Sequence, residues 1–266
     1  MKIAGIIPSR YASTRFPGKP LTDISGKTMI QRVYEQAKKA KSLSDVIVAT
    51  DDERIQKCVL DFGGKVAMTS SEHKSGTDRC AEVVEKFYDD FDAAINIQGD
   101  EPHIHPEQID EVAKCFAEKT VQLATLVKVI ESPEDVFNPN RIKVVIDKNQ
   151  NAIYFSRNPI PWSPDLPAFN LPSHLLAQKP TGLLPSVFHL PSSVIFYKHI
   201  GIYGYRISTL KEITKLKQSS LEITESLEQL RWIENGYKIK TRITKLESVS
   251  IDSPEDLKKL INLATE

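Results

Sequence analysis

A short basic segment near the start of the chain has the residues of an anion-binding site. Arg10, Arg15 and Lys19 follow an apolar run, with the hydroxyl groups of Ser13 and Thr14 between them. Arginine grips phosphate with a planar fork and lysine with a point charge, so several cations in one loop match a triphosphate better than a monoester. The segment has neither the G-x-G-x-x-G pattern of a dinucleotide site nor the pattern of a P-loop. Charge alone leaves a solvated basic loop as an equal alternative.

A second polar group follows the apolar run in INIQGDEP. Asp100 comes directly after a glycine there, where a side chain points into the ligand crevice of an α/β sheet. Because Mg²⁺ takes one or two carboxylates together with phosphate oxygens, Asp100 is a candidate magnesium ligand. Gln98 is placed to read a base or a sugar hydroxyl. The alternatives are a plain turn here and, for Asp252, a surface carboxylate that matters only if it reaches Asp100 to share the metal.

The stretch SGTDR, residues 75 to 79, predicts the start of a helix with Thr77 as its cap. Arg79 falls in the first turn, where the positive end of the helix dipole disfavours a cation. A capped helix explains the threonine but not the arginine. An anionic or nucleotide ligand would offset the arrangement.

Histidine and cysteine give no metal or disulfide pattern. The six histidines lack a spacing such as H-E-x-x-H, and His199, which begins an apolar strand, is the one that we expect to be functional. Cys58, Cys80 and Cys115 are too scattered for a disulfide framework or a zinc site, and each falls on a predicted helix.

The overall charge excludes some classes of protein. The 266 residues hold 35 Lys and Arg against 35 Asp and Glu, so no bulk affinity for nucleic acid or membrane is expected. Residues 1 to 41, however, hold nine Lys and Arg against two acidic residues, which indicates a local anion site. No stretch is apolar enough for a transmembrane helix and the first residues are too short for a signal peptide, so we expect a cytoplasmic protein.

The first half of the chain alternates apolar runs with amphipathic stretches. This pattern predicts a parallel sheet with helices on both faces and ligands outside the carboxyl ends of the strands. The expected strands are 2–9, 45–51, 65–70 and 93–100, and the expected helices are 28–40, 53–64, 76–88 and 105–119.

The rhythm changes after about residue 122. Longer alternating strands are expected at 123–130 and 199–206, a hairpin at 141–157, a helix at 220–236, and a final helix at 251–264 capped by Ser253. Eight of the sixteen prolines lie between Pro159 and Pro191, so we expect a long surface excursion at about 162–193.

Taken together, these stretches closely resemble the 3-deoxy-manno-octulosonate cytidylyltransferases, the CMP-Kdo synthetases. The resemblance runs over nearly the whole chain and is carried, in order, by IPSRYASTRFPGKPL, VATDDERI, MTSSEHKSGTDRCAEV, NIQGDEP, YFSRNPIPW, HIGIYGYR, LEQLRWIENG and IDSPEDL. It implies a GT-A-like nucleotidyltransferase fold, a homodimer, CTP and Kdo as substrates, and a role in lipopolysaccharide synthesis. It also implies one domain over 1–266, with a nucleotide-binding part at 1–122 and a sugar-binding and dimerisation part at 123–266.

The resemblance also implies roles for individual residues. The triphosphate loop would contain Arg10, Ser13, Arg15 and Lys19, and the catalytic residues would be Arg15, Lys19 and Asp100. Arg79 and Gln98 would lie at the cytidine and sugar side, and Asp100 and Asp252 would hold Mg²⁺. The Kdo pocket would be lined by Arg157, His199, Tyr203, Glu228 and Gln229, together with Gln98.

Two departures from the family pattern concern the sugar side and the metal. The segment from Trp162 to His199 is longer and richer in proline than the family pattern, which bears on the rim of the sugar pocket or the dimer edge. The stretch before Asp252 lacks the glycine expected there.

Three other functions stay open at this point. The chain would be a cytidylyltransferase for another acidic sugar, such as 8-amino-Kdo or sialic acid, if only its sugar-side residues differed. A GT-A-like glycosyltransferase would use Asp100 for its metal but would have no need of a triphosphate loop. A non-catalytic nucleotide sensor would have no need of both Asp100 and Asp252 beside the cations.

Overall fold

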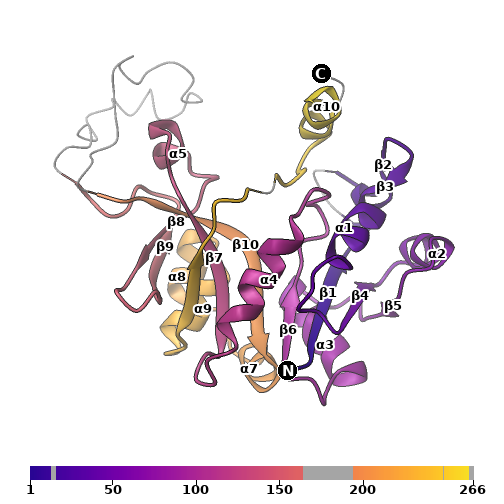
Figure 1. The fold of residues 1–266 in the computed structure, drawn as a ribbon, viewed down its shortest axis with the longest axis horizontal. Coiled ribbons are helices and arrows are strands. Elements are labelled where there is room, and N and C mark those ends of the chain that lie inside the picture. The colour runs from indigo at the N-terminus through magenta and orange to yellow at the C-terminus, as the bar shows by residue number, and fades with distance from the viewer. Residues whose placement is uncertain (13–15, 164–193, 248, 264–266) are drawn as a thin grey trace.

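The chain folds around one large sheet, which the computed structural model shows for residues 1–12, 16–163, 194–247 and 249–263 (Figure 1). The sheet has nine strands, in the order β11-β7-β10-β6-β1-β4-β5, with the hairpin β8–β9 attached to β10. The strands are β1 (Ile3–Ser9), β4 (Asp45–Thr50), β5 (Val66–Met68), β6 (Ala93–Asn96), β7 (Leu123–Val129), β8 (Lys143–Ile146), β9 (Ala152–Ser156), β10 (Tyr197–Arg206) and β11 (Ile239–Ile243).

Most neighbouring strands are parallel, as the alternation of apolar runs and helices predicts. Strand β1 pairs in parallel with both β4 and β6, and β11 pairs in parallel with β7. Strand β10 runs antiparallel between β6 and β7, and β8 is antiparallel to β10 and β9. The expected fold class, a mostly parallel α/β sheet with a smaller antiparallel region, is confirmed.

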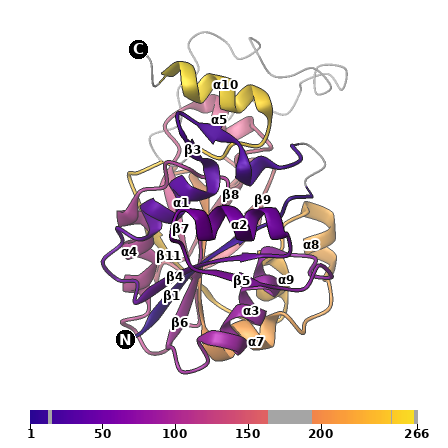
Figure 2. The same ribbon diagram turned by 90° about the vertical axis from the view of Figure 1, so that its right-hand side faces the viewer.

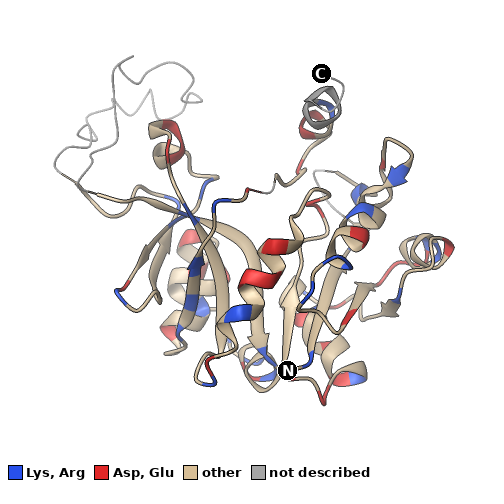
Figure 3. Cartoon of the chain, viewed as in Figure 1, with Lys and Arg blue, Asp and Glu red and all other residues tan. Residues whose placement is uncertain are grey.

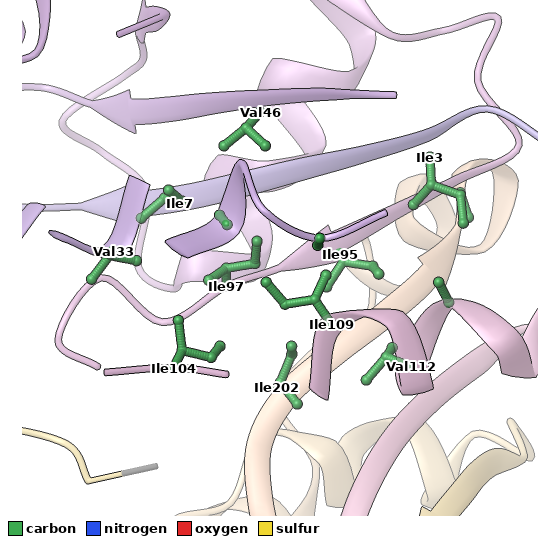
Figure 4. Packing of buried hydrophobic residues seen from close by; sticks show 14 of the residues in the cluster. Ile3, Ile7, Val33, Val46, Ile95, Ile97, Ile104, Ile109, Val112 and Ile202 are labelled. Atoms are coloured by element: carbon green, nitrogen blue, oxygen red, sulfur yellow. The ribbon is translucent and has the colours of Figure 1, made fainter. Parts of the chain in front are cut away.

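Helices cover both faces of the sheet, because side chains of successive residues in a buried strand point to opposite sides. Ile3 and Ile7 of β1 belong to one apolar core and Ala4 and Ile6 to the other. Figure 4 shows the first core, where strand residues such as Ile95 pack against Ile109 and its neighbours. The helices of this face are α1 (Met29–Ala37), α2 (Glu53–Asp61) and α4 (Pro106–Cys115), and those of the other are α3 (Gly76–Phe87), α7 (Ile207–Ile213) and α9 (Gln229–Glu234).

Several predictions of local structure are wrong in detail. The helix expected at 220–236 is two helices, α8 (Ser220–Glu225) and α9, because Ser226 adopts a left-handed conformation with φ 53°. Thr77 does not cap α3; Ser75 does, through a capping box with Asp78. Strand β11, the helix α5 (Pro133–Phe137), the helix α7 and the small hairpin of β2 (Asp23–Ile24) and β3 (Lys27–Thr28) were not expected.

The carboxyl ends of the parallel strands meet at one side of the molecule. In Figures 1 and 2 the N-terminus lies at the opposite end from the helix α10 (Pro254–Leu263), and the loops that follow β1 and β6 lie on the same side as α10. Figure 3 shows residues of both charge signs along the chain in this view. No helix in the described ranges is both long and apolar enough to cross a membrane.

Candidate active site

The loop after β1 is fixed by glycine and by a stacked arginine. The backbone N–H of Gly18 donates to the carbonyl of Tyr11 at 3.0 Å, and Gly18 has φ +70°. A Cβ there would lie 3.2 Å from the Tyr11 ring, so glycine is required for both reasons. The guanidinium of Arg54 lies 3.3 Å from the centre of the same ring. The loop thereby delivers Lys19, the first residue of the 3-10 helix η1 (Lys19–Leu21), to the strand ends.

The ammonium of Lys19 lies between the two aspartates that the sequence analysis selected as metal ligands. Its Nζ is 2.7 Å from Oδ2 of Asp100 and 3.6 Å from Oδ1 of Asp252. It also donates to the carbonyl of Ile251 at 3.0 Å. The backbone N–H of Ile251 donates to the carbonyl of Asp100 at 2.9 Å, so main-chain bonding as well as charge holds the two aspartates near one point.

The C-terminal segment that carries Asp252 is anchored on both sides of that residue. Ile251 is fully buried in a small apolar cluster with Ile24 and Met29. On the other side Ser253 caps α10, as expected: its hydroxyl accepts from the backbone N–H of Asp256 at 3.2 Å and donates to the Asp256 carboxylate at 2.9 Å. The apolar cluster around Ile251 and the cap of α10 therefore fix the position of Asp252, which is 152 residues from Asp100 in the sequence.

A glycine lets the segment after β6 run against β1. A Cβ on Gly99 would lie 2.9 Å from the carbonyl oxygen of Pro8, which is closer than real Cβ atoms come. The backbone N–H of Ile97 donates to the carbonyl of Ile6 at 2.9 Å, so the two chains stay together beyond the end of β6. Asp100 therefore lies beside the cationic loop that follows β1.

Arg79 of α3 is a buried cation with incomplete hydrogen bonding. Its side chain is 1% exposed, and Nη1 donates to the hydroxyl of Thr69. Nη2 lies 3.3 Å from Oδ2 of Asp51 without the alignment of a hydrogen bond. Within the described ranges, neither Nε nor Nη2 has a hydrogen-bond partner. Buried donors of this kind are costly unless a ligand completes them.

These side chains share one cleft of about 490 Å³. It brings together six of the predicted site residues, Arg10, Lys19, Arg79, Gln98, Asp100 and Asp252. It is also lined by Pro8, Ser9, Ala12, Pro20, Gly76 and Gly99. Ser13, Thr14 and Arg15 lie outside the described residues, as does the greater part of the proline-rich segment, residues 164–193.

The other predicted sugar-side residues do not line this cleft, as far as the described ranges show. Gln98 lines the cleft and also lies near β10, because a Cβ on Gly201 of β10 would lie 3.9 Å from the Cγ of Gln98. His199 and Tyr203 lie on the same strand, on either side of Gly201 in the sequence, with ring centres 5.0 Å apart. The Nε2 of His199 is 3.0 Å from the hydroxyl oxygen of Thr125. Burial lowers the pKa of His199 to about 3, so its imidazole is neutral at physiological pH.

Glu228 and Tyr203 also lie in surroundings that disfavour charge. Burial raises the pKa of Glu228, although the hydroxyl of Thr77 donates to its Oε2 at 2.7 Å. Burial raises the pKa of Tyr203 as well, and its ring packs edge-on against Trp232 at 5.1 Å. The region around β10 therefore disfavours charge, whereas the cleft holds charged groups.

The guanidinium of Arg157 donates its hydrogen bonds to backbone carbonyls of the protein itself. Its Nε donates to the carbonyl of Glu225 at 2.8 Å, and its Nη1 and Nη2 donate to the carbonyls of Pro139 and Ser226 at 3.1 and 3.4 Å. It thus ties the end of β9 to the break between α8 and α9. Gln229, the first residue of α9, is buried.

The sequence analysis gave no role to two residues that the structure brings to Arg79. Asp51 follows β4 in VATDD just as Asp100 follows β6, and Thr69 follows β5. A polar residue at the carboxyl end of an apolar run was the signal that selected Asp100. The same signal would have selected both of these.

A mostly parallel sheet with cations and two aspartates in a cleft at its strand ends defines a nucleotidyltransferase. A thymidylyltransferase structure from Bacillus anthracis, described as putative, has the same fold, with a TM-score of 0.61 at 15% identity over 99% of this chain and 96% of that one. The family model described as Cytidylyltransferase matches residues 4–241. The chain belongs to the cytidylyltransferase family, and within it to the 3-deoxy-manno-octulosonate cytidylyltransferases.

The similar proteins agree along almost their whole length. A 3-deoxy-manno-octulosonate cytidylyltransferase from Parabacteroides distasonis is 55% identical over 98% of this chain and 97% of its own length. Another from Thermodesulfovibrio yellowstonii is 47% identical over 95% and 94%. A solved structure of CMP:2-keto-3-deoxy-manno-octonic acid synthetase complexed with CTP superposes with a TM-score of 0.84 at 38% identity, over 100% of this chain and 99% of that one.

Proposed function

We propose that this enzyme transfers CMP from CTP to the anomeric hydroxyl of 3-deoxy-manno-octulosonate, Kdo, and releases pyrophosphate. The observation that carries the proposal is the meeting of Lys19 with Asp100 and Asp252 in a cleft that also holds Arg10 and Arg79. The relatives are named for the same reaction, and the similar solved structure is described as complexed with CTP.

The first task of such an enzyme is to bring two anions together. CTP carries a triphosphate and Kdo a carboxylate, so the uncatalysed encounter is opposed by repulsion. Arg10 and Lys19 would hold the triphosphate, and Arg15 would join them from the part of the loop outside the described residues. Lys19 would stabilise the departing pyrophosphate. Losing one such preorganised charge typically costs about 10² to 10³ in rate.

The two aspartates fit a magnesium ion. Their carboxylates already converge on one cation, the Lys19 ammonium, at 2.7 and 3.6 Å. The described residues contain no group of three or more His, Cys, Asp or Glu that would hold a metal without help. A site with two carboxylates matches Mg²⁺, which completes its shell with phosphate oxygens and water. When bound there, Mg²⁺ would lower the pKa of the attacking hydroxyl and offset negative charge at phosphorus.

The sugar would lie on the β10 side of the cleft. Gln98 lines the cleft and lies near Gly201 of β10, and His199 and Tyr203 lie on that strand on either side of Gly201. Neutral donors and acceptors suit a polyhydroxylated acceptor, because they fix its hydroxyl groups without competing for the cations. Glu228 and Gln229 approach the same region from α9 and the turn before it.

The wider setting rests on the family resemblance. We propose that the enzyme acts as a homodimer in the cytoplasm and supplies the activated sugar for lipopolysaccharide synthesis. Size-exclusion chromatography with light scattering tests the dimer, since a monomer at working concentration would contradict it.

The test of the reaction is a pyrophosphate-release assay with CTP and Mg²⁺. Kdo, 8-amino-Kdo and sialic acid should be compared side by side, with Kdo expected to give the highest kcat/KM. A higher value for another acidic sugar would move the assignment to that substrate, which the family names do not favour. CTP binding without turnover of any keto-sugar acid would indicate a nucleotide sensor.

A further inference from the structure

Four neighbouring strands end at this side of the sheet, each followed by a polar residue, and the cleft there is lined mainly by residues that follow β1 and β6 and by Arg79 of α3. Along the order β6-β1-β4-β5, Asp100 comes after β6, Arg10 after β1, Asp51 after β4 and Thr69 after β5. Arg79 lies at the β4 and β5 end, where it meets both Asp51 and Thr69. One end of the cleft thus holds the aspartates and Lys19, and the other holds a buried guanidinium.

The inference rests on the proposed reaction, because that reaction determines which part of the nucleotide lies at each end of the cleft. Phosphorus and acceptor must meet beside Asp100, because β10 and its neutral side chains lie beyond β6. The triphosphate would then lie near Lys19 and Arg10. The base is left with the β4 and β5 end, where Arg79 lines the cleft.

Arg79 is charged and buried, and it belongs to the first turn of α3 near the positive end of its dipole. The carboxylate of Asp51 is the acidic partner that the structure gives it, at 3.3 Å. Asp51 is not itself among the described residues lining the cleft, so it acts on a ligand through Arg79. The hydroxyl of Thr69 occupies Nη1, and the Nε and Nη2 donors stay without a hydrogen bond among the described residues.

We propose that Asp51 is a positioning residue for base selection: it orients Arg79 so that the free donors Nε and Nη2 face the O2 and N3 acceptors of cytosine. The fork of an arginine matches two adjacent acceptors. Uracil carries a hydrogen on N3, so it would oppose a donor with a donor and leave a buried group unpaired. Selection of CTP over UTP would then depend on a carboxylate that does not touch the nucleotide.

The experiment compares Asp51→Asn with Asp45→Asn in the full-length chain. Asp45 begins β4, at the end of the strand opposite Asp51; its side chain is similarly shielded (17% exposed against 21%), and it pairs with Lys65 outside the cleft. CTP and UTP binding are measured by calorimetry, and kcat and KM by pyrophosphate release with Kdo.

For Asp51→Asn we expect the Kd for CTP to rise about tenfold and the preference for CTP over UTP to fall about tenfold, as for loss of a charge-assisted contact. The KM for Kdo and the kcat at saturating CTP should stay within about threefold of wild type. Asp45→Asn should keep the wild-type selection. Affinity for CTP and UTP that falls by the same factor, or no change in either, overturns the proposal, as does an equal loss of pyrophosphate binding, which would place Arg79 on phosphate.

A second variant covers the case in which Asp51→Asn does not fold. Asp51→Glu keeps the charge against the buried guanidinium but moves it by one methylene, and thermal unfolding checks that it is folded. Selection of CTP over UTP should still fall, and wild-type selection in a folded Asp51→Glu protein overturns the proposal. Because binding is measured without Kdo, a chain that selects CTP but releases no pyrophosphate would refute the transfer reaction and not the role of Asp51.

Discussion

Ionisable side chains are treated in opposite ways on the two sides of Gln98. On the cleft side, Lys19 and Asp100 form an ion pair while their side chains are still 15% and 26% exposed. On the β10 side, burial lowers the pKa of His199 and raises the pKa of Tyr203 and of Glu228, so all three are biased towards their neutral forms. The cleft therefore holds charged groups that solvent and ligands can reach. The region around β10 holds buried groups whose surroundings disfavour charge.

The difference follows from what supports each group. Lys19, Asp100 and Asp252 are in the loops after β1 and β6 and in the segment before α10, where solvent reaches them, whereas Arg79 of α3 is the buried exception. His199 and Tyr203 are in the interior of β10, which pairs with β6 and β7 on its two sides, and Trp232 of α9 packs on Tyr203. A sheet interior desolvates a side chain more than these strand ends do, so position in the fold separates Lys19, Asp100 and Asp252 from His199 and Tyr203.

The largest effect is expected from the carboxylate at the centre of the charged side. Asp100→Ala removes the closest partner of Lys19 and a candidate Mg²⁺ ligand, so turnover should fall by about 10² to 10³. Pyrophosphate release from CTP and Kdo measures it. Asp90→Ala is the matched control, since Asp90 pairs with Lys2 at the same 2.7 Å but on the open surface. Near wild-type turnover in Asp100→Ala would contradict the metal role.

Lys19→Met is expected to have a smaller effect on turnover, which should fall, and to strengthen the binding of divalent metal. Loss of the ammonium should lower turnover by about 10², since the triphosphate loses a cation. Divalent metal should bind the nucleotide-free protein more tightly, because the residual carboxylates are no longer neutralised by an amine at 2.7 and 3.6 Å. An increase in metal affinity on the order of tenfold corresponds to ~1.4 kcal/mol of binding free energy.

Calorimetry with Mg²⁺ or Mn²⁺ in the absence of CTP measures the second part. Lys27→Met is the control, because Lys27 forms an equally short pair with Glu35 on the surface. If Lys19→Met bound metal no better than wild type, the two aspartates would not be sharing a cation site with the lysine.

Local patterns in the sequence predicted the elements and the cleft residues, because both depend on short-range order. Apolar runs placed β1, β4 and β6, and the polar residues directly after them gave Arg10 and Asp100. The resemblance to a family then supplied Asp252, whose approach to Asp100 depends on contacts across the whole chain. The hydrophobic pattern cannot show such contacts.

The failures have the same physical origin. Arg79 is in the helix α3, whereas Asp51 follows the strand β4. Assembly of the sheet and its helices brings the two side chains together. The antiparallel insertion of β10 and the addition of β11 beside β7 are likewise decided by assembly of the sheet. The break at Ser226 interrupts a good helical pattern, because this residue adopts a left-handed conformation with φ 53°.

The smallest effect is expected on the neutral side and concerns stability. The folded pKa of His199 is about 3 and its ordinary value is 6.5, so between these values the unfolded chain binds a proton that the folded chain does not. The free energy of unfolding therefore falls as the pH drops below 6.5, by up to about 1.4 kcal/mol per pH unit from this residue. His199→Gln, which can still hydrogen-bond Thr125, should remove that slope.

Urea denaturation at pH 8, 6.5 and 5.5 measures the free energy of unfolding of both proteins. At pH 8 the difference between them contains no proton uptake by His199 and sets the reference. Between pH 6.5 and 5.5 the variant should lose about 1 kcal/mol less than wild type. Equal losses would mean that His199 takes up its proton without unfolding. The contrast between a charged and a neutral side of the site would then hold for Tyr203 and Glu228 but not for His199.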